Sequence, residues 1–181
     1  MEKKKTLPKF EPAICEHCKQ TTEYALSLDR GTAMIVLAVY NRVRIKDKNN
    51  VHLRDEMEVG SKAYSDYREM VTDGHITSRM IDNVLRAKYH GLLAQVDGGG
   101  RGEYLITRKG AAFLRDVPLD RVAIIDKATH TKKCYWNPGE DMVTFAELMK
   151  KETPFWKIEP FDVEEATGTF REVDSQSPTL F

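Results

Sequence analysis

Two cysteines lie close together near the start of the chain, in the run Cys15-Glu-His-Cys18. Thiolates at this spacing can share one metal ion, but a structural zinc site needs four ligands. The best second pair is His130 and Cys134, because the three residues between them fall within metal-ligand spacing. We therefore predict a structural zinc site of Cys15, Cys18, His130 and Cys134, which would tie the N-terminal arm to the region after residue 116.

Other interpretations of the cysteines stay open. His17, His52, His75 and His90 are rival donors, although each is more often an ordinary surface or packed histidine. Cysteines that are only buried are the next alternative. A redox pair should open a helix in a β-α-β unit, and a cysteine nucleophile needs a defined histidine partner. Because neither context is present, thiol chemistry is the least favoured.

A glycine-rich run from Gly98 to Gly102, interrupted by Arg101, separates two short apolar runs at 92–96 and 104–107. A phosphate-binding loop would need a helix after its last glycine, and a P-loop would also need Lys-Ser or Lys-Thr there. Here Gly102 is followed by Glu-Tyr-Leu-Ile, a strand-forming run. The glycines are therefore expected to form the tip of a β-hairpin.

Two helical patterns precede this hairpin. Apolar residues recur at helical spacing over 61–71, a turn at 72–75 interrupts them, and the period resumes over 76–90. The core face of the second helix is expected to hold Ile76, Met80, Ile81, Val84 and Leu85.

Arg79, Asn83 and Arg86 would then lie on one outward stripe of that helix. Arginine can bind guanine edges and asparagine can bind adenine edges in the major groove, so these residue types suit a DNA-reading helix. The alternative is that they are the ordinary polar face that every soluble helix has.

Other local signals place the remaining elements of this region. A short strand is expected at 24–28, and Asp29 is expected to cap a helix that runs to residue 45. This helix is apolar nearly all round and hence buried, although its β-branched residues keep a strand interpretation open. A second short strand is expected at 51–53, and Gly91 suits the C-terminal cap of the helix at 76–90.

The order of helix, turn, helix and hairpin, followed by the run "YLITRKGAAFL" from Tyr104, resembles the winged-helix family of DNA-binding proteins. Thr107 would cap the closing helix, Gly110 would permit close packing beneath it, and Phe113 and Leu114 would return to the core. The resemblance covers roughly residues 30–116. It implies that 76–90 is the recognition helix and that Arg101 is the wing tip. The DNA-binding residues would be Ser78, Arg79, Asn83, Arg86, Lys88, Arg101, Arg108 and Lys109.

The layout is also similar to small uncharacterised phage and bacterial proteins that combine a C-x-x-C with a winged helix. The matching parts here are Cys15 and Cys18, the helix at 31–40, "KYHGLL" from Lys88 and the pair Val117-Pro118. No activity comes with this likeness.

Charge and composition limit the function classes. The net charge is zero, but residues 76–116 carry seven basic against four acidic residues, so a local basic face is possible. The basic start of the chain lacks an apolar segment behind it, and the longest apolar run is far shorter than a membrane span, so a cytoplasmic protein without membrane contact is expected. No convergent acid, base, nucleophile or phosphate loop indicates an enzyme.

We therefore expect an α+β fold in which a winged helix-turn-helix carries a short N-terminal knuckle and a small β-rich C-terminal appendage. The expected divisions are a basic arm and knuckle at 1–28, the winged helix at 29–116, an appendage with strands near 121–126, 132–136 and 141–145 within 117–163, and a disordered acidic tail at 164–181. The leading hypothesis is a double-stranded-DNA-binding protein, a small transcriptional regulator or a phage-type accessory protein, possible as a homodimer. The competing hypothesis is an interaction module whose winged helix binds a host or phage protein.

Overall fold

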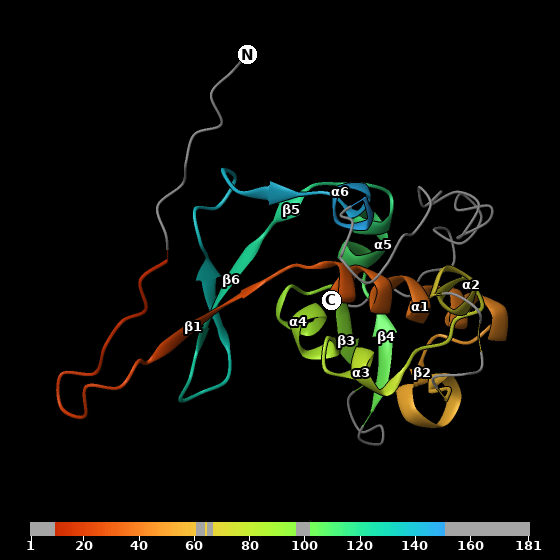
Figure 1. The fold of residues 1–181 in the computed structure, drawn as a ribbon, viewed down its shortest axis with the longest axis horizontal. Coiled ribbons are helices and arrows are strands. Elements are labelled where there is room, and N and C mark those ends of the chain that lie inside the picture. The colour runs from red at the N-terminus through yellow and green to blue at the C-terminus, as the bar shows by residue number, and fades with distance from the viewer. Residues whose placement is uncertain (1–9, 61–63, 65–66, 97–101, 151–181) are drawn as a thin grey trace, which may run out of the picture.

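The computed structural model describes residues 10–60, 64, 67–96 and 102–150. Within these ranges the chain forms helices and antiparallel sheets, so the predicted α+β class is confirmed (Figure 1). The arm at 1–9, Arg101 and the acidic tail lie outside the described residues.

Helix α1 (Arg30–Lys46) is the centre of the fold. Asp29 caps it by accepting a hydrogen bond from the backbone N–H of Thr32 at 2.8 Å. Ten consecutive residues of α1, 32–41, are buried, because a helix that is apolar nearly all round must be covered on every side. The predicted cap and buried helix are confirmed, and the strand interpretation of this segment is excluded.

The first sheet has the order β2-β4-β3, with β2 at Val51–His52, β3 at Leu93–Gln95 and β4 at Glu103–Ile106. Both pairs of strands are antiparallel, and Leu93 lies opposite Ile106. The hairpin predicted on either side of the glycine run is therefore confirmed.

Short helical segments connect β2 to β3. They are a π-helical turn η1 (Leu53–Met57), α2 (Tyr67–Thr72), α3 (Ser78–Ile81) and α4 (Val84–Tyr89). The predicted turn after α2 contains Gly74 at φ +72°, and a Cβ there would lie 2.7 Å from the backbone of Arg42. Only glycine fits this left-handed turn against α1.

The segment 76–90 is not the single helix that the sequence predicts. It is divided into α3 and α4 at Asp82 and Asn83, where the N–H of Asn83 donates to the carbonyl of Met80 in a tight turn. Ile76 lies before α3 and forms a parallel bridge with Glu58. Asp82 and Asn83 keep helical backbone angles, and α1 contacts both halves, so only the hydrogen-bond pattern of the helix is interrupted there. Asparagine favours such turns over helix interiors.

The prediction that Leu85 belongs to the core face is also wrong. The buried stripe on α3 and α4 consists of Met80, Val84 and Ala87, whereas Leu85 beside it is 52% exposed. Gly91 follows α4 at φ +73°, as its predicted capping role requires.

A second sheet has the order β1-β6-β7, with β1 at Glu23–Ser27, β6 at Val122–Asp126 and β7 at Lys132–Tyr135. Both pairings are antiparallel, and Glu23 lies opposite Asp126. The strand that precedes α1 therefore shares a sheet with the C-terminal third, to one side of the helical body (Figure 1).

The remaining elements attach the C-terminal third to the core. Strand β5 (Leu119–Asp120) pairs with β8 (Met142–Val143), and α6 (Phe145–Met149) follows with a capping box of Thr144 and Glu147. Phe145 packs edge-on against Phe113, with ring centroids 5.7 Å apart. The expected strands of this region are present, and α6 closes over α1.

Helix α5 (Arg108–Leu114) begins where the sequence predicts. The Oγ1 of Thr107 accepts a hydrogen bond from the N–H of Gly110 at 2.9 Å, and Phe113 and Leu114 are fully buried. A Cβ on Gly110 would lie 2.2 Å from the carbonyl oxygen of Leu92. The close packing predicted beneath this glycine is therefore confirmed.

Gly110→Ala is expected to lower the free energy of unfolding by about 2 kcal/mol or more, because the added methyl group would force α5 away from the backbone of Leu92. The matched control is Gly60→Ala, since no atom lies within 4 Å of a Cβ at that position. Urea denaturation measures both changes. Equal stability of the two variants would show that α5 does not depend on this contact.

Candidate functional site

The outward face of α3 and α4 carries mostly polar side chains. Ser78, Arg79, Asp82 and Lys88 are exposed there, together with Leu85. The buried stripe of Met80, Val84 and Ala87 orients this face away from α1.

The predicted stripe of Arg79, Asn83 and Arg86 does not form one outward row. Arg79 is exposed, but Arg86 makes an ion pair with Asp29, the residue that caps α1. Asn83 lies against Gly31, where an added Cβ would be 2.7 Å from the side-chain nitrogen of Asn83. These two side chains contact the start of α1, so they hold α4 in place.

The carboxylate of Glu58 lies at the start of α3. Ser78 donates a hydrogen bond from Oγ to Glu58 at 2.6 Å, and Glu58 is also 3.5 Å from the guanidinium of Arg54. Ser78 is therefore exposed but already bonded to a carboxylate, which reduces its freedom to bind a phosphate.

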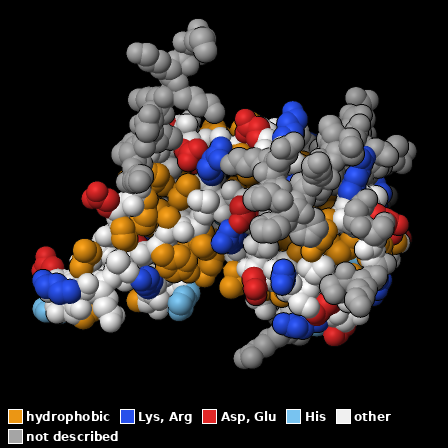
Figure 2. All heavy atoms as spheres, in the orientation of Figure 1, with side chains coloured by type: hydrophobic (Ala, Val, Ile, Leu, Met, Phe, Trp, Pro, Cys, Tyr) orange, Lys and Arg blue, Asp and Glu red, His pale blue; other side chains and the backbone are white. Residues whose placement is uncertain are grey.

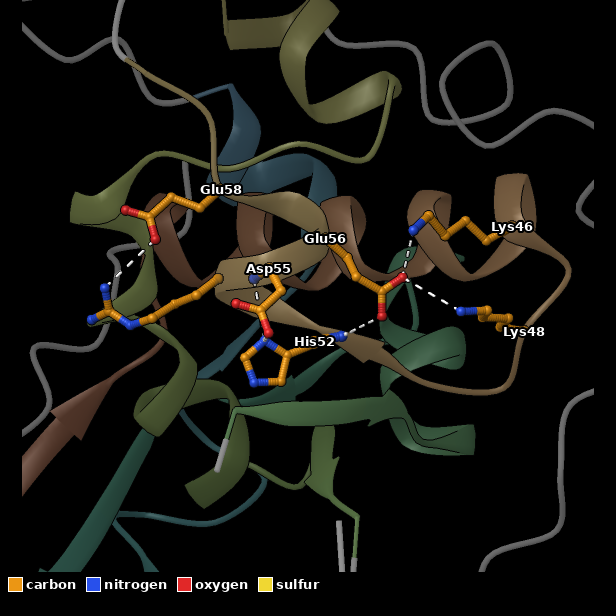
Figure 3. Close-up of polar contacts among 7 residues, drawn as sticks. Lys46, Lys48, His52, Asp55, Glu56 and Glu58 are labelled. Carbon is orange, nitrogen blue, oxygen red and sulfur yellow. Dashed lines mark hydrogen bonds and ion pairs between the residues drawn. The ribbon is translucent and has the colours of Figure 1, made fainter. Parts of the chain in front are cut away.

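Around η1, too, polar and basic groups are bonded to a carboxylate (Figure 3). Glu56 accepts hydrogen bonds from Lys46 at 2.5 Å and from the backbone N–H of His52 at 3.0 Å, and Lys48 lies 3.8 Å away. The bond from Lys46 is the main reason that the pKa of Glu56 is lowered. The positive charges of Lys46 and Lys48 are therefore balanced by Glu56 within the protein. The sequence does not indicate this pairing, because ten positions separate Lys46 from Glu56.

A group of basic and aromatic side chains joins α5 to the second sheet; we call Lys109, Lys132 and Tyr135 the basic junction. Lys109 donates to the Tyr135 hydroxyl at 2.8 Å, and the ammonium of Lys132 lies 4.3 Å from the Tyr135 ring centroid. Lys109 was predicted as a phosphate contact, whereas Lys132 was missed because only the fold brings β7 beside α5. Arg108 next to Lys109 is exposed, and exposed Lys88 lies 3.3 Å from Gln95 of β3.

His90 lies directly beneath the basic junction and is fully buried. Its Nε2 donates to the carbonyl of Leu26 in β1 at 3.1 Å, and the Tyr135 hydroxyl donates to the His90 carbonyl at 3.2 Å. Burial lowers the pKa of His90 to about 4, and the positive charges of Lys109 and Lys132 act in the same direction. A neutral His90 thus connects the end of α4 to the second sheet.

On the face shown in Figure 2, the basic and acidic side chains of the described residues are interspersed over the helical body. Arg101, the predicted wing tip, lies outside the described residues. Gly102 at the edge of the hairpin has φ +106°, and a Cβ there would lie 3.0 Å from Nε2 of His52. The role of Arg101 stays a prediction.

The four predicted zinc ligands lie in two separate segments, one before β1 and one at β7 and the turn that precedes it. Cys15 and Cys18 lie in a turn before β1, Cys134 is exposed on β7, and His130 is in the β6–β7 turn at φ +52°. Among the described residues, no three His, Cys, Asp or Glu side chains are grouped so that they could hold a metal ion. Zinc binding therefore stays a prediction.

Comparisons of the chain with protein-family models, with curated proteins and with solved structures found no match. In the part of the chain that the structure describes, no helix has the length and apolar character needed to cross a membrane.

The burial of His90 makes folding stability sensitive to acid. The folded-state pKa of about 4 lies below the ordinary 6.5, so the unfolded chain takes up this proton first as the pH falls. The contribution of neutral His90 is complete above pH 6.5 and is lost between pH 6.5 and pH 4, by at most roughly 3 kcal/mol.

Urea denaturation at pH 7 and pH 5 measures this loss. His90→Leu is expected to remove the part of the pH dependence that begins near neutrality, although it also loses the bond to Leu26. His130→Asn, at an exposed histidine, is expected to keep the wild-type pH profile. Identical pH profiles for the wild type and His90→Leu would contradict the conclusion that buried His90 causes this loss of stability.

Proposed function

We propose that the chain binds double-stranded DNA as a winged-helix protein, with α3 and α4 as the recognition segment and the β3–β4 hairpin as the wing. The observation that carries the proposal is the order of the elements. Helices α2, α3 and α4 are followed by the antiparallel pair β3–β4 and then by helix α5, which Thr107 caps by accepting the N–H of Gly110. The interruption between α3 and α4 shortens the recognition segment, and exposed Lys88 on it donates to Gln95 of the hairpin strand β3 at 3.3 Å.

Within this proposal, the basic side chains that lie exposed take the DNA contacts. Arg79 on the exposed face of α3 is the side chain best placed to reach base edges or phosphates. Lys88, Arg108 and the basic junction would neutralise phosphates on either side of it. Asn83 lies against Gly31 and Arg86 pairs with Asp29, so in this proposal both position α4 and are not assigned to bases. Arg101 keeps its predicted place at the wing tip.

An Arg79→Ala/Lys88→Ala double variant tests the assignment. Each phosphate contact that is removed should flatten the dependence of log affinity on log salt by about one, so affinity for a pool of random-sequence duplexes should fall roughly tenfold or more at moderate salt. Fluorescence anisotropy over a salt series measures both quantities. The matched control, Lys150→Ala, removes an exposed positive charge just after α6, on the side of the body away from α3 (Figure 1).

The control should bind as the wild type does. An unchanged affinity and salt slope in the double variant would falsify DNA binding through this face, and a wild-type chain that does not bind the pool would do the same.

One observation favours the competing function, a protein-binding winged helix. Leu85 is 52% exposed in the middle of the α3–α4 face, where a leucine contributes apolar area that a phosphate backbone does not use. If the face binds a protein, Leu85→Ser should abolish that complex in a pull-down and leave binding to the duplex pool unchanged. The two substitutions thus separate the two functions.

A further inference from the structure

We propose that Asp82 determines which base sequence the α3–α4 face binds, by accepting a hydrogen bond from the amino group of a cytosine in the major groove. This role of Asp82 rests on the proposed function, because it concerns the same face. It narrows the partner from any duplex to a duplex that carries a cytosine at one defined position.

Asp82 lies in the outermost row of side chains on the α3–α4 segment. Asp82 and Asn83 both have helical backbone angles, so the helical period continues from α3 into α4. Ser78, Asp82 and Leu85 recur at the spacing of one helix face, and all three are exposed. We call these three residues the outer row. By the same period, the buried stripe of α3 and α4 lies on the opposite side.

Basic side chains flank the outer row. Arg79 and Lys88 are both exposed. Nine positions separate them, which is about two and a half helical turns, so they lie on opposite sides of the row. A helix in the major groove has base edges in front of it and a phosphate backbone on either side. When the two flanking cations meet phosphates, the outer row therefore faces the bases.

The carboxylate of Asp82 is not compensated within the described part of the chain. It has no hydrogen-bond or ion-pair partner there. The carboxylates nearby differ, since Asp29 pairs with Arg86 and Glu58 accepts from Ser78. An uncompensated negative charge in the middle of the face repels the phosphates of every duplex, whatever its sequence. This cost is offset only where a base donates a hydrogen bond to the carboxylate.

Cytosine is the base whose major-groove edge suits this carboxylate, because an ionised carboxylate only accepts hydrogen bonds. Guanine and thymine present acceptors, and adenine presents its amino donor beside the N7 acceptor, whereas cytosine presents the N4 amino donor alone. The rest of the outer row adds no donor. The Ser78 hydroxyl already donates to Glu58 at 2.6 Å, and Leu85 is apolar. A row of this composition favours the cytosine edge over the other three.

Selection of bound duplexes from a random-sequence pool, with the full wild-type chain, tests this role. The selected duplexes should share a cytosine at one position, and another base pair there should weaken binding roughly tenfold in fluorescence anisotropy. Asp82→Asn should shift the preference at that position to adenine, because an amide both donates and accepts and suits the N6 and N7 edge. Its affinity for the random pool should be at least that of the wild type, since a negative charge is removed and no phosphate contact is lost.

Two further variants serve as controls. Asp82→Glu retains the carboxylate and should keep the preference for cytosine. Glu140→Gln removes an exposed carboxylate in the turn before β8 and should also keep it. A wild-type chain that binds the pool without a preference for cytosine, or an Asp82→Asn variant with the wild-type preference, would overturn the role of Asp82 and leave the proposed function standing. A wild-type chain that does not bind the pool would overturn both.

Discussion

The burial of helix α1 on all sides is the constraint on which the rest of the structure depends. Within the described residues, α1 contacts each of the other α-helices. Its first turn is fixed by Asp29, whose carboxylate accepts from both the N–H and the hydroxyl of Thr32 at 2.8 Å. The same carboxylate pairs with Arg86, so the residue that begins the central helix also sets the position of α4. Gly31 adds a second contact, because a Cβ there would lie 2.7 Å from the side-chain nitrogen of Asn83.

This dependence explains what the sequence could predict and what it could not. The caps at Asp29 and Thr107, the turn at Gly74 and the hairpin are local features, since each depends on residues a few positions away. The place of Arg86 is not a local feature, because it pairs with a residue 57 positions earlier. A helical period therefore predicts one outward stripe, whereas contacts with the start of α1 take Asn83 and Arg86 out of it.

The second sheet illustrates the same limit at a larger scale. A strand at β1 could be predicted from its residues, but its partner could not, because β6 lies about a hundred positions later in the chain. That pairing brings Lys133 to Glu23, and it brings Lys132 beside Lys109 through Tyr135. A chain with zero net charge thus distributes its charges unequally: many basic residues are paired internally, while those around Tyr135 gather at one place. Neither the internal ion pairs nor the cluster of basic residues around Tyr135 can be found by counting charges along the sequence.

The second sheet also determines how the loop at 13–22 is connected to the α3–α4 face. Strand β1 runs from this loop toward Asp29, and its 5 residues span about 17 Å in extended form. Leu28 N–H donates to the Arg121 carbonyl at 2.7 Å, and His90 donates to Leu26, so β1 is held both to β6 and to the end of α4. Buried, neutral His90 joins the two parts, since its ring donates to β1 and its backbone ends α4. The α3–α4 face is therefore held in place from both of its ends, by His90 at the second sheet and by Asp29 at the start of α1.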